Sequence, residues 1–553
     1  MGSIDLITIL IFSLGVLLTG VSFSKTGKDM KSFFAGGGNV PWGMGGLSLF
    51  MGFFSAGTFV VWGSIAYSYG VVSIIIQLTM AFAGFAVGSF IAPRWHRTKS
   101  LTAAEYITER FGANIQKTYT YIFLAVSIFT TGSFLYPVAK IVEVSAGIPL
   151  TTSILVLGAF SMIYVAIGGL RGVIVTDVLQ FVILLAAVVI VVPLSFAKVG
   201  GVANFLEATP DGFFNCFNEE YSPGFIVAFA VYNMFFLGGN WAYVQRYTSV
   251  KSKRDAKKVG WLFGALYVIS PILWMLPPMI YRVYNPTLVG LQNEDAYLLM
   301  CKEAMPAGLL GLMLGGMIFA TASSLNATLN ISAGVFTNDI YRRLRPDVTQ
   351  KTLMRVARLS TLGFGIMAVI VALLVQNMGG IVNVVISVAA LTGVPIYLPI
   401  IWSLFSKRMS ARQLLAVTFV SLGINLFFKF VSPYLLGVSL NREWEMIIGS
   451  AVPFIMLVVF EYILKTRSFT DPLYYAYCEK KQLHVESTNM VNESEQSSTV
   501  NRFTQKVLGL SITLAGCLIL ILGFLSDEHQ WVPMSVACCI IGIGATLLVK
   551  STK

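Results

Sequence analysis

The segment Ala320-Thr321-Ala322-Ser323-Ser324 places three neutral oxygens where a small cation could bind, inside an apolar run from Leu309 to Leu329. On a helix, the Ala320 carbonyl and the hydroxyls of Ser323 and Ser324 fall on one face. A hard cation prefers such oxygen ligands. The alternative is that small hydroxyl residues let membrane helices pack closely and bond their own backbone, so the motif alone leaves both interpretations open.

Two other apolar segments are interrupted by glycine in a comparable way. One contains Gly52-Phe53-Phe54-Ser55-Ala56-Gly57, and the other contains Leu237-Gly238-Gly239-Asn240. Unwound backbone at such breaks frees carbonyl oxygens for a cation and N–H groups for an anion. Because glycine is common in membrane helices, the alternative is that both helices are continuous.

Membrane helices are the elements that must position these motifs. The chain has 553 residues, of which 56% are hydrophobic and 12% are charged. Apolar runs of about 20 residues, the length that crosses a bilayer, recur from end to end. We therefore predict an all-α polytopic membrane protein with about 15 spans, which lie near 3–23, 41–68, 69–94, 117–146, 149–167, 174–196, 223–243, 259–280, 306–336, 356–376, 381–405, 413–432, 445–465, 506–525 and 531–549.

The two interrupted helices are each the first of five spans. Spans two to six and seven to eleven therefore form two sets of opposite orientation, since each set has an odd number of spans. Matched broken helices in two such halves point to the midplane site of an inverted-repeat transporter. We predict a ten-helix core over 41–405, with repeats at about 41–196 and 223–405.

The remaining segments flank this core. We expect an extra amino-terminal helix over 1–24, two additional spans over 413–465 and a carboxyl-terminal hairpin over 506–549. The polar stretch 466–505 predicts a flexible cytoplasmic linker without a packed core. Between spans three and four, 102–112 predicts a short capped helix at the inner surface that ends at Gly112.

The net charge of +12 reports orientation, not a nucleic-acid partner. Lysine and arginine gather in loops that fall on one side if the spans alternate, at 25–31, 94–99, 246–258, 342–355, 407–412 and 550–553. By the positive-inside rule that side is cytoplasmic. We expect a multi-pass protein of the plasma (inner) membrane, with its amino terminus outside and its carboxyl terminus in the cytoplasm.

Catalytic and metal-site patterns are not prominent in the sequence. None of the three histidines falls in the middle of a predicted span, and we find no nucleophile–base pattern, so we do not expect an enzyme. Cys216 and Cys301 both fall in predicted outside loops. An oxidising face would permit a disulfide between them, although sequence does not show whether they are close.

A series of short motifs resembles the sodium:solute symporter family, which includes sodium/glucose, sodium/proline and sodium/iodide carriers. The resemblance covers about 25–465 and implies a LeuT-type core of ten helices that works by alternating access. Its strongest pieces, in this order and spacing, are Thr102 to Gly112, Gly147-Ile148-Pro149-Leu150, Gly168-Gly169-Leu170 leading to Thr176-Asp177-Val178-Leu179-Gln180, Asn240 to Arg246, and Ala320 to Ser324 followed by Thr337-Asn338-Asp339-Ile340-Tyr341.

The resemblance also implies a sodium site. Its ligands would be the backbone carbonyls of Met51 and Phe54 in the first broken helix, together with Ala320, Ser323 and Ser324. The two carbonyl ligands do not depend on side-chain type. The family pattern and the chemistry of the serine pair therefore point to the same sodium ion.

Asp177 matches an acidic residue that the family links to sodium release or to a second sodium ion. An acidic group near a span normally faces the bundle interior or a cavity. The alternative is an inner-surface residue that offsets Arg171. Some family members complete a second sodium site with hydroxyls just after the serine pair, where this chain has Asn326 and Ala327.

The resemblance places the substrate between the broken helices and their neighbours. The implied pocket consists of Phe53, Gly57, Thr58, Gln77, Tyr136, Lys140, Asn233, Phe236 and Tyr267. Sugar carriers have more polar groups at several of these positions, and a hexose left with unpaired hydroxyls would lose affinity steeply. We therefore expect a smaller or more apolar solute than a hexose.

Lys140 departs from the family pattern. A buried lysine is costly unless it is paired. It would either form an ion pair with Glu143, three residues further along the helix, or attract an anionic group of the substrate. The second interpretation favours an amino acid or another carboxylate as the solute.

Together these features predict a sodium-coupled secondary active symporter that imports a small organic solute by alternating access. Its partners would be the solute, sodium and the lipid bilayer. A sodium/sugar or sodium/polyol symporter is the alternative within the same class. From other classes, a transporter-like sensor and a sodium-permeable channel remain as alternatives.

Overall fold

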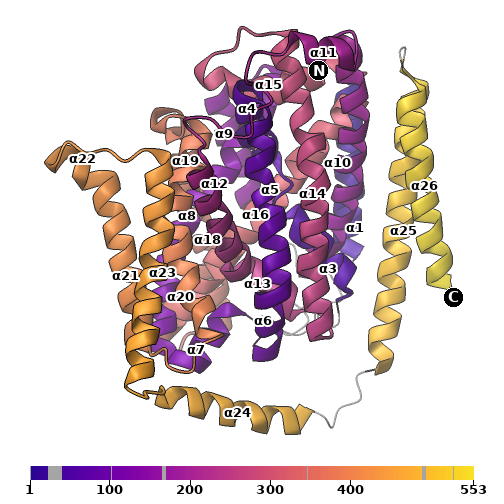
Figure 1. The fold of residues 1–553 in the computed structure, drawn as a ribbon. Helices are drawn as coiled ribbons and strands as arrows, with labels where there is room; N and C mark the ends of the chain where they lie inside the picture. Colours follow the sequence, from indigo (N-terminus) through magenta and orange to yellow (C-terminus); the bar gives the residue numbers. More distant parts are fainter. Residues whose placement is uncertain are drawn as a thin grey trace.

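The fold is a bundle of long helices that run between two ends of the molecule (Figure 1). This computed structural model describes residues 2–22, 40–100, 102–164, 170–345, 347–488, 494–526 and 529–552. Within those residues no strands form a sheet, and one isolated β-bridge joins Val40 to Val250. The predicted all-α class is therefore confirmed.

A helix, or a chain of consecutive helices, covers each expected span. In chain order these are α1 (Ser3–Ser22); α3 (Trp42–Met51), η2 (Thr58–Trp62) and α4 (Gly63–Tyr69); α5 (Val71–Ala86), η3 (Val87–Ile91) and α6 (Ala92–Thr98); α8 (Ala113–Ala146); α9 (Leu150–Tyr164); α10 (Leu170–Lys198); α12 (Pro223–Gly239) and α13 (Trp241–Thr248); α14 (Lys253–Tyr284); α16 (Leu309–Val335), η5 (Phe336–Tyr341) and α17 (Arg342–Leu344); α18 (Gln350–Leu374); α19 (Gly380–Val388), η7 (Ala389–Gly393) and α20 (Val394–Ser403); α21 (Ala411–Leu426), η8 (Phe427–Val431) and α22 (Ser432–Leu435); α23 (Arg442–Thr466); α25 (Ser494–Phe524); and α26 (Trp531–Thr552).

Shorter helices lie between these long ones. They are α7 (Ala103–Phe111), α11 (Val202–Ala208), η4 (Gly290–Asp295), α15 (Ala296–Ala304), η6 (Gln376–Met378) and α24 (Pro472–Thr488). Elements α11 and α15 lie at one end of the bundle, and α7 and α24 lie at the other (Figure 1). Helix α6, which carries Arg94 and Arg97, also lies at the α7 end (Figure 1).

Length and composition alone support slightly fewer spans than expected. Among the described residues, 10 helices are long and apolar enough to cross a membrane, or 11 if the bent pair α12–α13 is one span. The other expected spans are the broken helix α3–α4 and the shorter apolar stretches in α1, α9 and α16. For those the crossing remains a prediction.

The core has the expected LeuT-type inverted-repeat arrangement. The first set runs from α3 to α10 and the second from α12 to α20, and each set begins with a helix that is broken partway. In Figure 1, α4 lies above α3, whereas α13 lies below α12. The two broken helices therefore run in opposite directions, as an inverted repeat requires.

Facing glycines bring α5 and α14, the second helices of the two sets, into backbone contact. A Cβ on Gly84 would lie 2.6 Å from the nitrogen of Gly264, and one on Gly260 would lie 2.5 Å from the Cα of Gly88. Small residues at this spacing let membrane helices approach closely. This contact places the helix that carries Gln77 directly against α14.

The extra helix α1 docks on the amino terminus of α16, the helix that carries the serine pair. The buried Asp5 carboxylate accepts hydrogen bonds from the backbone N–H groups of Gly308, at 2.6 Å, and Gly311, at 3.1 Å. The first N–H groups of a helix have no partner within the helix, and a carboxylate there also interacts favourably with the helix dipole. Asp5 therefore caps a core helix from outside the core.

Removing this cap is expected to destabilise the protein. Asp5→Ala leaves the Gly308 and Gly311 N–H groups unpaired in a buried position, at a cost of about 1–2 kcal/mol. Asp5→Asn keeps one acceptor oxygen and is expected to cost less. Thermal unfolding in detergent tests this ranking of the three stabilities. An Asp5→Ala variant as stable as the wild-type protein would contradict the prediction.

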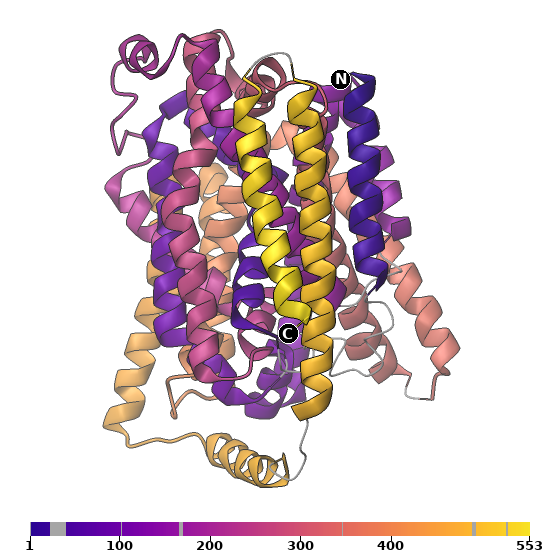
Figure 2. The ribbon, with the colours of Figure 1, turned by 90° about the vertical axis from the view of Figure 1, so that its right-hand side faces the viewer.

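The carboxyl-terminal hairpin stands on the flank of the bundle. Helices α25 and α26 pack against each other and against α10, and α25 also touches α1 (Figure 2). The hydroxyls of Thr19 and Ser511 are 3.1 Å apart across that contact. The hairpin therefore contacts the core mainly through α10, the last helix of the first repeat, and also through α16.

Part of the segment 466–505, for which the sequence predicts a flexible linker, is helical in the structure. Residues Pro472–Thr488 form α24, which packs against α7. Just before α24, the carboxylate of Asp471 lies 2.5 Å from Nη1 of Arg110, and both side chains are buried. Polar composition suggested a lack of core, but the ion pair and nearby tyrosines supply partners that composition does not show.

Two local predictions can also be compared with the structure. Helix α7 is capped as expected, since Thr102 accepts a hydrogen bond from the Glu105 N–H at 3.1 Å and the helix ends before Gly112. Cys216 and Cys301 do not form a disulfide: both are free, and Cys301 is buried in α15 whereas Cys216 is exposed. The sequence predicts both cysteines in outside loops, but in the structure only Cys216 is exposed.

Candidate functional site

The first broken helix loses its regular hydrogen bonding at the predicted glycine segment. Helix α3 ends at Met51, and the chain becomes helical again only after Ser55. The N–H groups of Phe53 and Phe54 both bond back to the Phe50 carbonyl, at 3.0 and 3.1 Å. The Ser55 N–H turns to the Thr58 hydroxyl at 3.3 Å instead of to the Met51 carbonyl.

At this break two backbone carbonyls have no hydrogen-bond donor among the described residues. No residue that the structure describes donates a hydrogen bond to the oxygen of Met51 or to that of Phe54. An unpaired carbonyl at membrane depth is costly unless another group satisfies it. These are the same two oxygens that the sequence predicts as sodium ligands, and an oxygen-seeking cation would satisfy both.

Helix α16 meets the broken helix at its serine motif. The Ala56 N–H donates to the Thr321 hydroxyl at 2.8 Å, and that hydroxyl donates to the Met317 carbonyl at 2.8 Å. The Ser324 hydroxyl lies 3.4 Å from the Ala320 carbonyl. The side chain of Ser323 is outside the described residues. The structure therefore joins the break to the serine helix through Thr321.

Thr321 was not among the predicted site residues. It belongs to the same motif, three residues before Ser324, and these two side chains are neighbours on the helix surface. Thr321 could have been predicted as a site residue because it lies between the predicted ligands in the sequence. A buried hydroxyl there needs a hydrogen-bond partner on the neighbouring helix.

The second broken helix bends sharply at the predicted glycine-asparagine segment. Helices α12 and α13 meet at Asn240 with a bend of 60°. The Asn240 side-chain oxygen accepts from the Ala242 N–H at 3.0 Å, and its amide donates to the Tyr397 hydroxyl at 3.3 Å. The alternative of a continuous helix is excluded at both glycine segments.

Asp177 is buried and contacts α3, the first half of the first broken helix. The Ser48 hydroxyl of α3 donates to its Oδ2 at 2.7 Å. Ser48 lies one turn before Met51, so this bond positions the end of α3 from which one predicted ligand projects. The half-buried Arg246 guanidinium also interacts electrostatically with Asp177, whereas the side chain of Arg171 is outside the described residues.

Aromatic side chains gather around the break in the first helix. Phe53 packs edge-on against Phe236, with ring centroids 6.0 Å apart, and lies 4.7 Å from Tyr243 and 6.4 Å from Tyr267. Phe53, Phe236 and Tyr267 are three of the predicted pocket residues, so the structure brings them together. Tyr243 was not predicted, although it follows the second break on the same helix face as Asn240.

The polar residues of the predicted pocket have mixed surroundings. The Thr58 hydroxyl donates to the Phe53 carbonyl, and the Asn233 amide donates to Thr79 at 2.8 Å. Gln77 is buried, and its amide nitrogen has no hydrogen-bond partner among the described residues. A buried amide donor without an acceptor destabilises the protein unless a ligand or a water molecule accepts its hydrogen bond.

Two predicted pocket residues belong to a separate cluster. The Tyr136 hydroxyl donates to Oε2 of Glu294 at 2.9 Å. The ammonium group of Lys140 lies 2.9 Å from Glu143 and 3.1 Å from Asp295. The ion pair with Glu143, one of the two interpretations of Lys140, is therefore present, and a second carboxylate joins it. Gly57, on the broken helix, lies beside Pro137 of the same helix as Tyr136.

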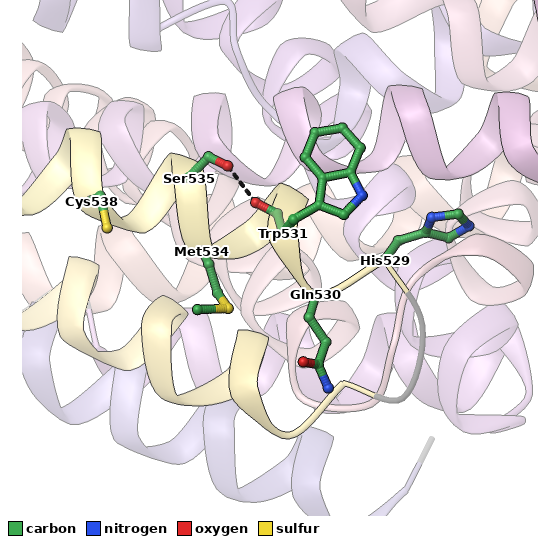
Figure 3. Close-up of a pocket in the computed structure, with 6 residues that line it drawn as sticks. All are labelled: His529, Gln530, Trp531, Met534, Ser535 and Cys538. Atoms are coloured by element: carbon green, nitrogen blue, oxygen red, sulfur yellow. Dashed lines mark hydrogen bonds between the residues drawn. The ribbon is translucent and has the colours of Figure 1, made fainter.

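An open recess elsewhere in the molecule does not fit a solute site. It has a volume of about 650 Å³ at the turn of the carboxyl-terminal hairpin and is lined by His529, Gln530, Trp531, Met534, Ser535 and Cys538 (Figure 3). The Ser535 hydroxyl bonds to the Trp531 carbonyl within its own helix. The recess lies on the flanking hairpin and includes none of the predicted residues.

The arrangement of the helices defines the class of protein. Two sets of opposite direction, each beginning with a broken helix, form the fold of inverted-repeat secondary transporters. The profile of the sodium:solute symporter family matches residues 33–419, well over half of the chain. The chain belongs to the sodium:solute symporter family, and it is a sodium-coupled, multi-pass membrane transporter.

Individual relatives agree with this assignment. The chain is 27% identical over 451 residues to the sodium/myo-inositol cotransporter 2 of Mus musculus, covering 74% of this chain and 67% of that one. It is 26% identical over 464 residues to the sodium/glucose cotransporter of Vibrio parahaemolyticus, covering 77% and 85%. A solved sodium-coupled sialic acid symporter in a substrate-bound, outward-open state superposes with a TM-score of 0.70 at 25% identity, covering 84% and 97%.

Proposed function

We propose that this protein uses the inward sodium gradient to import a small organic solute. The single observation that carries the proposal is that the carbonyls of Met51 and Phe54 accept no hydrogen bond from the described residues, next to the helix that carries Ala320, Ser323 and Ser324. Sodium bound by these groups would hold the outward-open arrangement and allow the solute to bind beside it. Coupling requires that sodium and solute each raise the other's affinity.

The orientation of the chain follows from its charged loops. The α7 end, where α6 carries Arg94 and Arg97, would face the cytoplasm of the cell, whose plasma (inner) membrane would hold the protein. The amino terminus would then lie outside and the carboxyl terminus inside. The end with η4, α11 and α15 would be the side from which sodium and solute enter.

The solute would contact Phe53, Phe236 and the neighbouring aromatic rings, with Gln77 as a hydrogen-bond donor. These side chains favour a compact solute with at least one apolar face and one hydrogen-bond acceptor. The earlier preference for a carboxylate depended on a free Lys140. Since Lys140 already has two carboxylate partners, we propose a small organic solute without a preference for an anion.

A sugar or polyol is the second candidate. It is favoured by the similarity to the sodium/myo-inositol and sodium/glucose cotransporters. Such a solute would need more hydrogen-bond partners than Gln77 alone. Asn233 and Thr58 would have to exchange their present partners for solute hydroxyls.

A thermal-shift screen of the purified protein against a solute library, run in sodium and in potassium, tests the proposal. A ligand that binds the folded state raises its melting temperature by mass action. We expect stabilisation by one class of solute in sodium and none in potassium. Equal stabilisation in both salts would contradict sodium coupling. The class of the stabilising solute would decide between a compact, partly apolar solute and a sugar or polyol.

Asp177 is expected to matter for sodium affinity through Ser48. Asp177→Asn removes the charge that holds the Ser48 hydroxyl, and a hydrogen bond to a charged group is worth about 1.5–3 kcal/mol. We therefore expect the sodium concentration for half-maximal thermal stabilisation to rise by about tenfold or more, since 1.4 kcal/mol is tenfold. Ser48→Ala removes the bond but not the charge and should give a smaller rise. Unchanged sodium dependence in both variants would show that this contact does not position the site.

A further inference from the structure

Basic side chains gather on the first two turns of α14, at the α7 end of the bundle (Figure 1). All of the following are exposed: Lys253, Arg254, Lys257 and Lys258. No carboxylate among the residues that the structure describes lies within ion-pair distance of any of them. The acidic residue of this stretch, Asp255, accepts a hydrogen bond from the Ser252 hydroxyl at 2.9 Å instead. The described part of the protein therefore supplies no counter-ion for these charges.

Two tryptophan rings lie under two of the ammonium groups. Nζ of Lys257 is 5.3 Å from the ring centroid of Trp261, one turn further along α14. Nζ of Lys258 is 5.3 Å from the ring centroid of Trp42, the first residue of α3. Trp261 and Trp42 are 45% and 40% exposed. Because tryptophan is enriched at the boundary between hydrocarbon and headgroups, the two rings indicate where the lipid headgroups lie along α14.

Beyond Trp261, the same face of α14 is apolar and exposed. Positions 253, 257, 261, 268 and 272 share one face of a helix. The exposed side chains on this face change from lysine to tryptophan and then to Val268 and Ile272. A helix rises about 1.5 Å per residue, so the stretch from Trp261 to Ile272 measures about 16 Å, close to one leaflet of a hydrocarbon core about 30 Å thick. The face therefore follows the order of a phospholipid: headgroup, interface and acyl chains.

Neighbouring elements extend this surface. Helix α6 packs against α14 and carries the exposed Arg97 at the same end of the bundle. On η3, the Ser89 hydroxyl accepts a hydrogen bond from the Trp261 indole N–H at 3.1 Å, and the next residue, Phe90, is exposed. The Trp261 ring is thus held between α14 and η3, with a basic side chain on one side of it along the membrane axis and apolar side chains on the other.

We propose that this surface binds an anionic phospholipid. The lipid phosphate would lie at Lys257 and Lys258, beside the rings of Trp261 and Trp42, and an acyl chain would lie along Val268 and Ile272. The inference goes beyond the transport function, because it requires only that α14, which is long and apolar enough to span a membrane, does so. In the proposed orientation the lipid belongs to the cytoplasmic leaflet.

The charges explain why the lipid is anionic. A zwitterionic headgroup carries its own ammonium group, which the basic side chains of α14 would repel, whereas a headgroup with a net negative charge supplies the missing counter-ion. Since Trp42 is the first residue of α3, the bound lipid would also contact the helix that ends at Met51. The site therefore joins the first helices of both the lipid-facing surface and the broken segment.

Thermal unfolding of the purified full-length protein in detergent, titrated with phosphatidylglycerol, tests the site. The buffer contains potassium and no sodium, so the result does not depend on sodium coupling. We expect the melting temperature to rise with phosphatidylglycerol and to change little with phosphatidylcholine or with inorganic phosphate. Equal stabilisation by phosphatidylcholine would show that no anion is preferred. Equal stabilisation by inorganic phosphate would show that no lipid is needed, and either result would overturn the proposal.

Replacing Lys257 and Lys258 together by glutamine removes both ammonium groups and keeps polar side chains at the surface. Each basic residue near an anionic lipid surface strengthens binding about fivefold, so the phosphatidylglycerol concentration for half-maximal stabilisation should rise about 25-fold. Lys257→Arg with Lys258→Arg keeps both charges and should stay close to the wild-type value. A double glutamine variant with the wild-type lipid dependence would contradict the site.

Lys465→Gln with Arg467→Gln is the matched control. These two basic residues are also exposed, at the end of α23 that leads into α24, and their replacement removes the same amount of charge (Figure 1). We expect this variant to keep the wild-type dependence on phosphatidylglycerol. An equal loss in the two double glutamine variants would show that net charge, and not the surface on α14, determines lipid binding.

Discussion

Replacing Ser323 and Ser324 together by alanine is expected to abolish sodium-dependent uptake while the protein remains folded in the membrane. The double variant removes two of the five proposed ligands and leaves the carbonyls of Met51, Phe54 and Ala320. Each lost ligand that is worth about 1.4 kcal/mol lowers sodium affinity tenfold, so we expect a loss of about 100-fold or more. Uptake into membrane vesicles, with the solute found by the thermal-shift screen, measures this loss.

Ser332→Ala is the control for the loss of a hydroxyl from the same helix. The Ser332 hydroxyl is buried further along α16, where it donates to Ser127 at 2.9 Å and to the Thr328 carbonyl. We expect this variant to keep the sodium dependence of the wild-type protein. If the double serine variant also kept its sodium dependence, the hydroxyls would be packing groups and the proposed sodium site would be wrong.

Breaking the buried pair of Arg110 and Asp471 is expected to give the largest loss of stability. Their side chains are 1% and 5% exposed, and Arg110 also donates to the Met409 carbonyl at 3.0 Å. Asp471→Asn leaves a buried guanidinium without its counter-ion, which costs about 3–5 kcal/mol. The loss should appear as a lower melting temperature and as faster proteolysis at the docked helix α24.

A more exposed pair at the same end of the bundle provides the control. Arg408 and Glu461 are 34% and 26% exposed, so Glu461→Gln should cost about 0–1 kcal/mol. The double variant Arg110→Met with Asp471→Leu should recover much of the loss, because apolar residues can replace a buried pair. Equal melting temperatures for Asp471→Asn and Glu461→Gln would show that α24 does not depend on its ion pair.

The breaks in the core could be predicted from the sequence because their signal is local. Glycines and an asparagine inside long apolar runs indicate where a membrane helix stops, and the structure breaks at Gly52–Ser55 and at Asn240. Counting spans then gave the opposite direction of the two repeats. The predicted carbonyl ligands depend only on the position of the first break, so side-chain differences from relatives did not affect them.

Contacts between distant segments could not be predicted in the same way. Nothing near Asp471 in the sequence indicates Arg110, which lies on a short helix far earlier in the chain, and composition therefore suggested a free linker. Likewise, Lys140 has an evident partner in Glu143 but meets Asp295 only in the fold. Such pairs form only when distant helices pack together, and local sequence patterns do not show which helices do so.

The most direct test of the account is concentrative uptake by the purified protein in sealed liposomes. An inward sodium gradient is imposed with no other driving ion, and the accumulated solute is measured against an equal potassium gradient. We predict that the solute accumulates above its external concentration with sodium and only equilibrates with potassium. Equal accumulation in the two salts would contradict sodium-coupled symport.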